Sequence, residues 1–350
     1  MEAIHKNIGQ NFIVGIPENE PSDEYLDFIT EYNIGGVLFL GRNYPSFEMF
    51  IDTVNKLQSA AAVHPLFTCV DHEGGRVQRF TEPFTRLPSY RELIKDRTAK
   101  EIFEIFMLIS RELLACGINF NLAPVTDMTD GTDGAIGDRS IGTDLEKVDA
   151  AISSSIRGFI KGGMLCCAKH FPGHGCVTVD SHIELPKSDK TMEELLNYEI
   201  LPFKKATKSG VSSIMTAHIL FEKIDSLPAS LSKAFITEII RKEFRFIKLI
   251  LTDDISMGAI KKNYSTIDAT SLAIKAGSDM VIHSSPDINE LSNLIDDTVR
   301  LSERDLELKN QLKASYSRIA EMKKNIAFKS IDPNSALDIL SKSELKGLFT

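Results

Sequence analysis

The hydrophobic positions of this chain alternate between two patterns. The first pattern consists of short apolar runs rich in β-branched and aromatic residues, which are typical of strands buried on both faces. Eight such runs follow one another, and each predicts a strand. They are FIVGI from Phe12, GGVLFLG from Gly35, LFTCVD from Leu66, NFNLAPVTD from Asn119, MLCCAKH from Met164, SSIMTAH from Ser212, LILTDD from Leu249 and DMVIHSS from Asp279.

The second pattern lies between these runs and has the period of an amphipathic helix. Clear examples are residues 99–117, 145–163, 192–210 and 231–244, several of which end in Gly as helix C-caps do. Eight strands with intervening helices over about 285 residues fit a (β/α)8 barrel of the TIM type, for which ~250 residues is typical. A doubly wound open sheet is the alternative, because periodicity does not show whether the sheet closes.

Two further helical segments follow the eighth run, at 288–301 and 303–326, and a tail covers 327–350. We therefore expect one barrel domain over residues 1–326 and a C-terminal helical extension, 327–350, that packs on the barrel. The remaining length leaves no room for a second full domain.

Composition narrows the functional classes. The net charge of −9 argues against a nucleic-acid partner, since phosphate neutralisation needs a basic face. The N-terminus lacks the features of a signal peptide, and no apolar run approaches the ~18 residues that span a bilayer. Five cysteines without paired CxxC spacing suggest reduced thiols rather than disulfides or a zinc ribbon. We expect a cytoplasmic protein, a monomer without membrane contact.

Polar residues gather where the predicted strands end, which is where a TIM barrel carries its active site. Six of the eight histidines lie at or just beyond such ends. Taken singly, Asp127 or Asp254 could equally be a helix N-cap. Lys169 directly follows a buried run, so its ammonium group must find a carboxylate or a ligand hydroxyl. The strand-end residues are Asp71, Asp127, Lys169, His170, His218, Asp253, Asp254 and His283.

Two segments carry the most specific chemistry. In KHFPGHGCVTVDSH, proline and glycines predict a loop, and Asp180 and His182 would point to the same side in an extended conformation. A carboxylate beside an imidazole makes a proton donor and acceptor near neutral pH. In LILTDDISMGAI, an aspartate at the barrel mouth can act as a nucleophile or stabilise a cation. The alternation leaves open whether Asp253 or Asp254 does so.

These segments also resemble a known family. DHEGGRVQRF, GDRSIG, KHFPGHGCVTVDSH, IMTAH and TDDISM, spread over residues 71–257, are similar in content and order to the motifs of glycoside hydrolase family 3, and within it to the bacterial β-N-acetylglucosaminidases. The sequence departs from the family pattern at His72, usually Gln, at Cys176 and Val177 in a commonly more polar loop, and in TDDISM where SDDLSM is usual.

The resemblance implies roles for individual residues. Asp253 would be the catalytic nucleophile, and His182 with Asp180 would form the acid/base dyad. The hydroxyls of the terminal sugar would be held by Asp71, Arg79, Arg139, Lys169 and His170, and His218 would line the same pocket.

The implied activity is that of a retaining exo-β-N-acetylglucosaminidase that needs no cofactor and no metal. It would remove terminal N-acetylglucosamine from short glycans through a glycosyl-aspartate intermediate. The implied substrates are cytosolic muropeptides of peptidoglycan recycling, and the absence of Trp argues against a long aromatic platform for polysaccharide. A neutral imidazole would not repel an anionic nucleophile, so a phosphorylase of the same family is an alternative.

Two other classes compete with this reading. A metal-dependent barrel hydrolase could use His170, His174, Asp180 and His182 as ligands, although the first strand carries no HxH pair. A non-catalytic sugar-binding protein would have no need for a nucleophile together with an oriented acid/base group.

Overall fold

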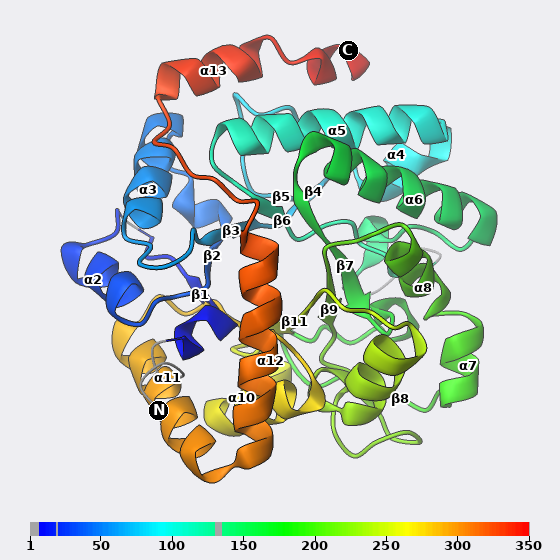
Figure 1. Ribbon diagram of the computed structural model, residues 1–350. Helices are drawn as coiled ribbons and strands as arrows, with labels where there is room; N and C mark the ends of the chain where they lie inside the picture. Colours follow the sequence, from blue (N-terminus) through cyan, green and yellow to red (C-terminus); the bar gives the residue numbers. More distant parts are fainter. Residues whose placement is uncertain (1–6, 19, 130–134, 350) are drawn as a thin grey trace.

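The structure is a computed structural model that describes residues 7–18, 20–129 and 135–349. In this part of the chain, eight parallel strands pair in chain order and close into a barrel, β12 returning to β1 (Figure 1). The TIM-type barrel is therefore confirmed, and the doubly wound open sheet is wrong. The prediction that the N-terminus lacks signal-peptide features concerns residues 1–6 in part, and these lie outside the described residues. The barrel strands are β1 (Phe12–Gly15), β2 (Gly36–Phe39), β3 (Phe67–Val70), β6 (Phe120–Asn121), β7 (Leu165–Phe171), β9 (Ser213–Thr216), β11 (Leu249–Asp254) and β12 (Met280–His283).

Helices connect successive strands and cover the outside of the barrel. The longer ones are α2 (Asp23–Glu31), α3 (Phe47–Ser59), α5 (Ala99–Ala115), α6 (Leu145–Gly162), α8 (Leu201–Lys208), the π-helical segment Ala234–Glu243, α10 (Thr266–Ala276), α11 (Ile288–Arg304) and α12 (Leu306–Lys323). Shorter elements are α4 (Tyr90–Asp96), α7 (Met192–Asn197), α9 (Gly258–Lys261), the antiparallel pair β4 (His72–Gly74) and β5 (Val77–Gln78), and the parallel pair β8 (Lys187–Ser188) and β10 (Leu220–Phe221).

Local sequence signals explain where several helices begin and end. Thr98 caps α5 and forms a reciprocal capping box with Glu101. Gly163 and Gly277 end α6 and α10 with φ of 89° and 115°, a left-handed conformation that favours glycine. The predicted helix over 192–210 is in fact two helices, α7 and α8. Pro202 lies in the first turn of α8, where its missing N–H costs no helical hydrogen bond.

The N-terminal end of the barrel is closed by α12 (Figure 1). Ile319 of this helix joins the apolar cluster that fills the barrel interior. Lys323, at the end of α12, is buried and donates hydrogen bonds from Nζ to Gln10 Oε1 at 2.8 Å and to the Gly35 carbonyl at 2.6 Å. Its Nζ also lies 4.6 Å from the centre of the Phe67 ring. The predicted site residues lie at the opposite end of the barrel, where the strands finish.

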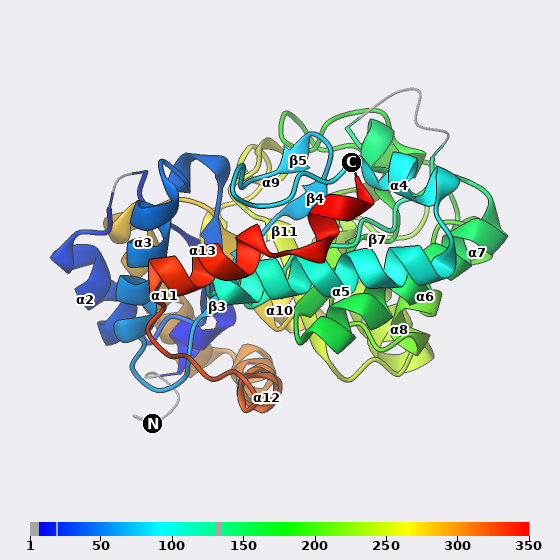
Figure 2. The same ribbon diagram turned by 90° about the horizontal axis from the view of Figure 1, so that it is seen from above.

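The C-terminal extension crosses the outside of the barrel. Helix α13 (Pro333–Ser341) packs against α5 and α3, and the turn Glu344–Leu348 packs against α5 (Figure 2). Leu340 and Leu345 are buried there, and Arg97 donates a hydrogen bond to the Leu348 carbonyl at 2.6 Å. None of the helices in the described residues combines the length and the apolar character needed to cross a membrane.

Lys323 predicts a pH dependence of stability. Burial lowers the pKa of Lys323 from its ordinary 10.5 to about 7. Between about pH 7 and pH 10 the unfolded chain holds this proton while the folded chain does not, so this site adds to the free energy of unfolding as pH rises. We expect Lys323→Met to remove that increment from melting temperatures measured across the window.

Lys324→Met is the matched control, because Lys324 is exposed and pairs only with Glu321 in the described structure. This variant should keep the pH dependence of the parent protein. Parallel curves for the parent and Lys323→Met would show that Lys323 is protonated alike in the folded and unfolded states.

Candidate active site

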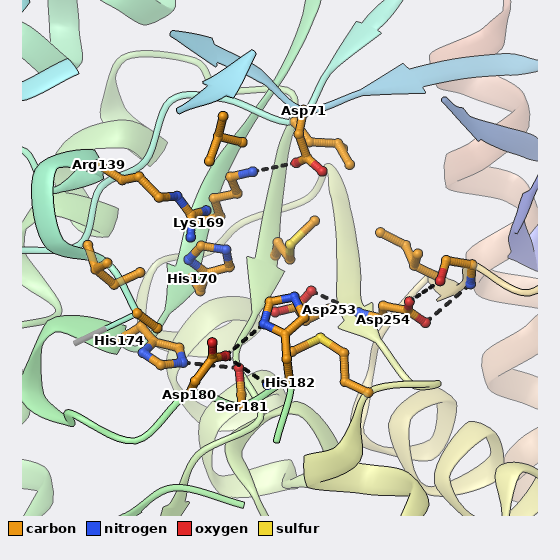
Figure 3. A pocket seen from close by; sticks show the side chains of 18 of the residues that line it. Asp71, Arg139, Lys169, His170, His174, Asp180, Ser181, His182, Asp253 and Asp254 are labelled. Atoms are coloured by element: carbon orange, nitrogen blue, oxygen red, sulfur yellow. Dashed lines mark hydrogen bonds and ion pairs between the residues drawn. The ribbon is translucent and has the colours of Figure 1, made fainter. Parts of the chain in front are cut away.

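A cavity of about 460 Å³ opens at the carboxyl ends of the barrel strands (Figure 3). Its walls combine charged and apolar side chains, and its size is in the range of small-molecule sites. Eight of the nine predicted site residues line it: Asp71, Arg79, Arg139, Lys169, His170, Asp180, His182 and Asp253. The fold thus brings together residues that are up to 182 positions apart, from Asp71 to Asp253.

A cluster of buried charges forms one wall of the cavity. Lys169 Nζ lies 2.6 Å from Asp71 Oδ1 and 2.6 Å from Glu73 Oε1. Arg139 makes a bidentate contact with Glu73 at 2.8 and 2.9 Å, and Arg79 approaches Asp71 at 3.5 Å. Lys169 has therefore found carboxylate acceptors, one of the two outcomes expected from its position after a buried run.

Electrostatics keeps this cluster ionised. Burial opposes the charge on Asp71, but Lys169 and Arg79 outweigh it and hold the pKa of the carboxyl well below its usual range. Burial also opposes the charge on Lys169, and Asp71 and Glu73 raise its pKa in return. Asp71 thus presents a fixed acceptor toward the cavity, and Arg79, Arg139 and Lys169 present three fixed cationic donors.

Glu73 was missed by the sequence reasoning. It is buried and does not line the cavity, yet it bridges Lys169 and Arg139. The signal was present: Glu73 stands two residues after Asp71 in an extended segment, and that spacing places both side chains on one side. The turn after Glu73 needs Gly74, with φ of 104°, because a Cβ there would lie 2.3 Å from the Pro88 carbonyl oxygen.

Asp127 fixes the orientation of His170. This fully buried carboxylate lies 2.7 Å from His170 Nδ1 and also accepts the backbone N–H groups of His170 and His174. The helix-cap interpretation of Asp127 is wrong, since it holds a histidine instead. With Nδ1 committed to Asp127, Nε2 is the ring nitrogen of His170 that can meet a ligand.

Asp180 and His182 form a hydrogen-bonded pair at the mouth of the cavity. Their Oδ1 and Nδ1 atoms are 2.7 Å apart, and the backbone N–H of His182 donates to the same oxygen at 2.9 Å. The two side chains meet through a turn, in which the Ile183 N–H donates to the Asp180 carbonyl, and not through the extended conformation expected from the sequence. Burial opposes ionisation of Asp180, but the His182 N–H groups lower its pKa. Nδ1 is thereby occupied, which leaves Nε2 for proton transfer.

The two neighbouring aspartates at the end of β11 have different surroundings. Asp254 accepts hydrogen bonds from the backbone and hydroxyl groups of Ser256 and Ser284, and so ties β11 to β12. Asp253 accepts one from the Asp254 N–H at 2.8 Å. Burial opposes its charge, but His170 and His218 nearby lower the pKa of Asp253. Asp253 is thus the ionised carboxylate whose oxygens have fewer protein partners in the described structure.

A comparison with sequence profiles of protein families matches residues 3–322 to the profile described as the N-terminal domain of glycosyl hydrolase family 3. The chain belongs to glycosyl hydrolase family 3. The prediction of a glycoside hydrolase is confirmed, as is the resemblance to the β-hexosaminidases of family 3.

Individual relatives agree with this assignment. A protein named beta-hexosaminidase from Idiomarina loihiensis is 36% identical over 253 residues, which cover 71% of this chain and 76% of that protein. A family 3 β-N-acetylglucosaminidase from Paenibacillus sp. FPU-7 has a TM-score of 0.85 at 29% identity, covering 97% of this chain and 68% of that one. A fungal multi-domain β-N-acetylglucosaminidase of family 3 has a TM-score of 0.90 at 29% identity over 98% of this chain, which spans 42% of that protein.

His218 is a correction to the predicted site. It is fully buried and does not line the cavity of this family 3 protein. Its Nδ1 lies 2.7 Å from the Ser230 hydroxyl, and its Nε2 lies 3.0 Å from the Asp254 carbonyl. His218 therefore stabilises the end of β11 through the Asp254 carbonyl and lies outside the cavity lining.

Two other strand-end histidines also lie away from the cavity. His283 is buried beside Glu290. His72 is buried against the rings of Phe80 and Phe84, and burial lowers its pKa to about 3. The Gln-to-His departure at position 72 therefore does not alter the cavity wall.

The histidines proposed as metal ligands are engaged separately. His170 pairs with Asp127, His174 Nε2 lies 3.2 Å from the Ser181 hydroxyl, and His182 pairs with Asp180. Within residues 7–18, 20–129 and 135–349, no group of three or more His, Cys, Asp or Glu side chains is placed to hold a metal ion.

The buried charge cluster predicts a stability effect. Glu73→Gln keeps the shape of the side chain but removes the charge that balances Lys169 and Arg139. We expect the free energy of unfolding, measured with urea, to fall by about 3 kcal/mol, as when one partner of a buried pair is lost. Glu222→Gln is the control, because the Lys187–Glu222 pair is exposed, and it should change the value by less than about 1 kcal/mol. Equal effects would contradict this account.

Proposed function

We propose that this family 3 protein is a retaining exo-β-N-acetylglucosaminidase. The observation that carries the proposal is that a carboxylate, Asp253, and a carboxylate-oriented imidazole, His182, line one small cavity. These are the two groups that a double-displacement reaction needs. The names of the relatives support β-N-acetylhexosamine as the sugar.

In the proposed first step, a carboxylate oxygen of Asp253 attacks the anomeric carbon. The bond from that carbon to the glycosidic oxygen breaks, its electron pair stays on the oxygen, and the oxygen takes the proton from His182 Nε2. In the second step, Nε2 removes a proton from water while the water oxygen attacks the anomeric carbon and releases Asp253. Two inversions give net retention, and both groups return to their initial states.

The charge cluster would hold the terminal sugar. Asp71 offers an acceptor to the cavity, and Arg79, Arg139, Lys169 and His170 offer donors. Such groups suit the bidentate recognition of hydroxyls, and a cavity of about 460 Å³ favours one terminal unit over an internal chain segment. This supports exo action.

The natural substrate is proposed at a finer level. We infer short glycans with a terminal N-acetylglucosamine, and among them the muropeptides of peptidoglycan recycling, acted on in the cytoplasm by a monomer. The support is the small size of the cavity, the likeness of the motifs to the bacterial β-N-acetylglucosaminidases and the provision of the predicted cavity-lining residues by one chain.

A phosphorylase of the same family is the second candidate. Its support is the imidazole at the acid/base position, because His182 becomes neutral after it donates a proton and a neutral ring does not repel phosphate.

Product analysis tests the two candidates. With nitrophenyl β-N-acetylglucosaminide we expect free N-acetylglucosamine, with and without phosphate, and far slower release from the matching β-glucoside. Asp253→Asn should be slower by at least about 10³-fold and should form no glycosyl-enzyme detectable by mass spectrometry. N-acetylglucosamine 1-phosphate as the main product would replace hydrolysis with phosphorolysis, and an intermediate retained in Asp253→Asn would show that another residue is the nucleophile.

The role of His182 predicts a dependence on the leaving group. His182→Ala removes the proton donor, so substrates with poor leaving groups should slow by about 10² to 10⁴-fold in kcat/KM. A dinitrophenyl glycoside needs little protonation and should be nearly unaffected in kcat/KM. Azide, which needs no general base, should accelerate its turnover. Equal slowing of both substrates would argue against the assigned role.

A further inference from the structure

The loop that carries His182 rests against the segment that follows Asp253. We propose that Gly258 is a positioning residue: its lack of a side chain lets this loop dock on the start of α9, and the docking holds His182 at the cavity. The inference rests on the acid/base role proposed above and adds the contact that sets its geometry.

Two backbone hydrogen bonds join the loop to α9. The Gly258 N–H donates to the His182 carbonyl at 3.2 Å, and the Ala259 N–H donates to the Ser181 carbonyl at 3.1 Å. Gly258 follows Asp253 by five residues, and the Met257 N–H in between donates to the Asp254 carbonyl at 3.1 Å. One short segment thus carries the proposed nucleophile and receives the loop that bears His182.

Only a glycine fits at position 258 in this arrangement. A Cβ atom there would lie 2.6 Å from the carbonyl oxygens of both His182 and Ile183, and 3.0 Å from the Ile183 carbonyl carbon. These are backbone atoms, which cannot rotate away as the end of a flexible side chain can. Any larger residue would therefore push the loop off α9 or shift α9 itself.

Other contacts of the loop lie toward its ends and on its far side. The Pro186 carbonyl accepts the Leu220 N–H at 2.9 Å, and the His174 N–H is held by Asp127. The Ser181 hydroxyl contacts His174 Nε2. The His182 side chain is 71% exposed, so packing does not fix it. Asp180 orients the ring at 2.7 Å from Nδ1, and the backbone that carries both residues bonds to α9 at residues 181 and 182.

This arrangement separates the effect of Gly258 from that of the sugar-binding wall. Asp71 and Lys169 belong to other strands and are held by their own ion pairs. A shift of the loop should weaken protonation of the leaving group while sugar binding is retained.

The test compares Gly258→Ala with the parent protein on two N-acetylglucosaminides. We expect kcat/KM for a methyl glycoside to fall at least about 10-fold, because its leaving group needs a proton. For the dinitrophenyl glycoside, kcat/KM should stay within about 2-fold. Azide should accelerate turnover of the dinitrophenyl glycoside, as expected when the acid/base group is weakened. Gly41→Ala is the control, because its Cβ would meet only the Arg79 carbonyl oxygen at 4.0 Å. It should leave both values unchanged.

A second variant guards against misfolding of the first. Ala259→Pro replaces the N–H that bonds to Ser181 with a ring carbon, which also separates the loop from α9 but adds no atom at position 258. It should show the same leaving-group pattern. An equal fall on both substrates, or no change on either, in a folded variant would overturn the inference. If His182→Ala itself shows no dependence on the leaving group, the proposed acid/base role of His182 is wrong. If His182→Ala shows that dependence but the Gly258 and Ala259 variants do not, only the positioning role of Gly258 is wrong.

Discussion

The ion pairs of Lys169 are the interaction on which the site depends. A lysine ammonium at the end of a buried strand is strongly disfavoured unless carboxylates surround it, and Asp71 and Glu73 both contact it at 2.6 Å. β3 and β7 are separated only by β6 in the barrel, so the pair with Asp71 bridges two alternate strands across β6. Side chains of alternate strands share one layer in such barrels. Burial of one cation therefore fixes the relative positions of the groups that would recognise the sugar.

The histidines of the site also differ in their hydrogen-bond partners, and these partners suit them to different roles. Asp127 holds His170 within the cavity wall, Asp180 holds His182 at the exposed rim, and Ser181 lies between His174 and that dyad. His170 is 6% exposed, whereas the His182 side chain is 71% exposed. A buried, fixed imidazole suits a constant hydrogen bond to substrate. A ring at the rim suits exchange of protons with water and with a leaving group that must depart.

The sequence predicted the strands well because each is buried on both faces and therefore reads as an apolar run. Strand-end placement also predicted that Asp71, Lys169 and Asp253 would meet, since the barrel brings all carboxyl ends to one face. It failed where a contact depends on a turn or on a second layer of residues. Glu73 acts through two cations, His218 faces Asp254 from behind, and the turn at Asp180 replaces the expected extended segment. Glu73 could have been found from its spacing to Asp71, whereas the place of His218 and the turn at Asp180 depend on tertiary packing, which residue spacing alone does not encode.

The two ends of the barrel differ in how they are closed. At the N-terminal end, α12 packs apolar side chains and one buried lysine against the strands. At the C-terminal end, the loop bearing His182 lies over the opening and bonds to α9 through main-chain groups only. Two main-chain hydrogen bonds at Gly258 and Ala259, rather than a packed helix, thus give residues 181 and 182 a defined position. A glycosidase needs that difference, because the aglycone must leave between the two chemical steps while the sugar stays covalently bound to Asp253 in the proposed mechanism.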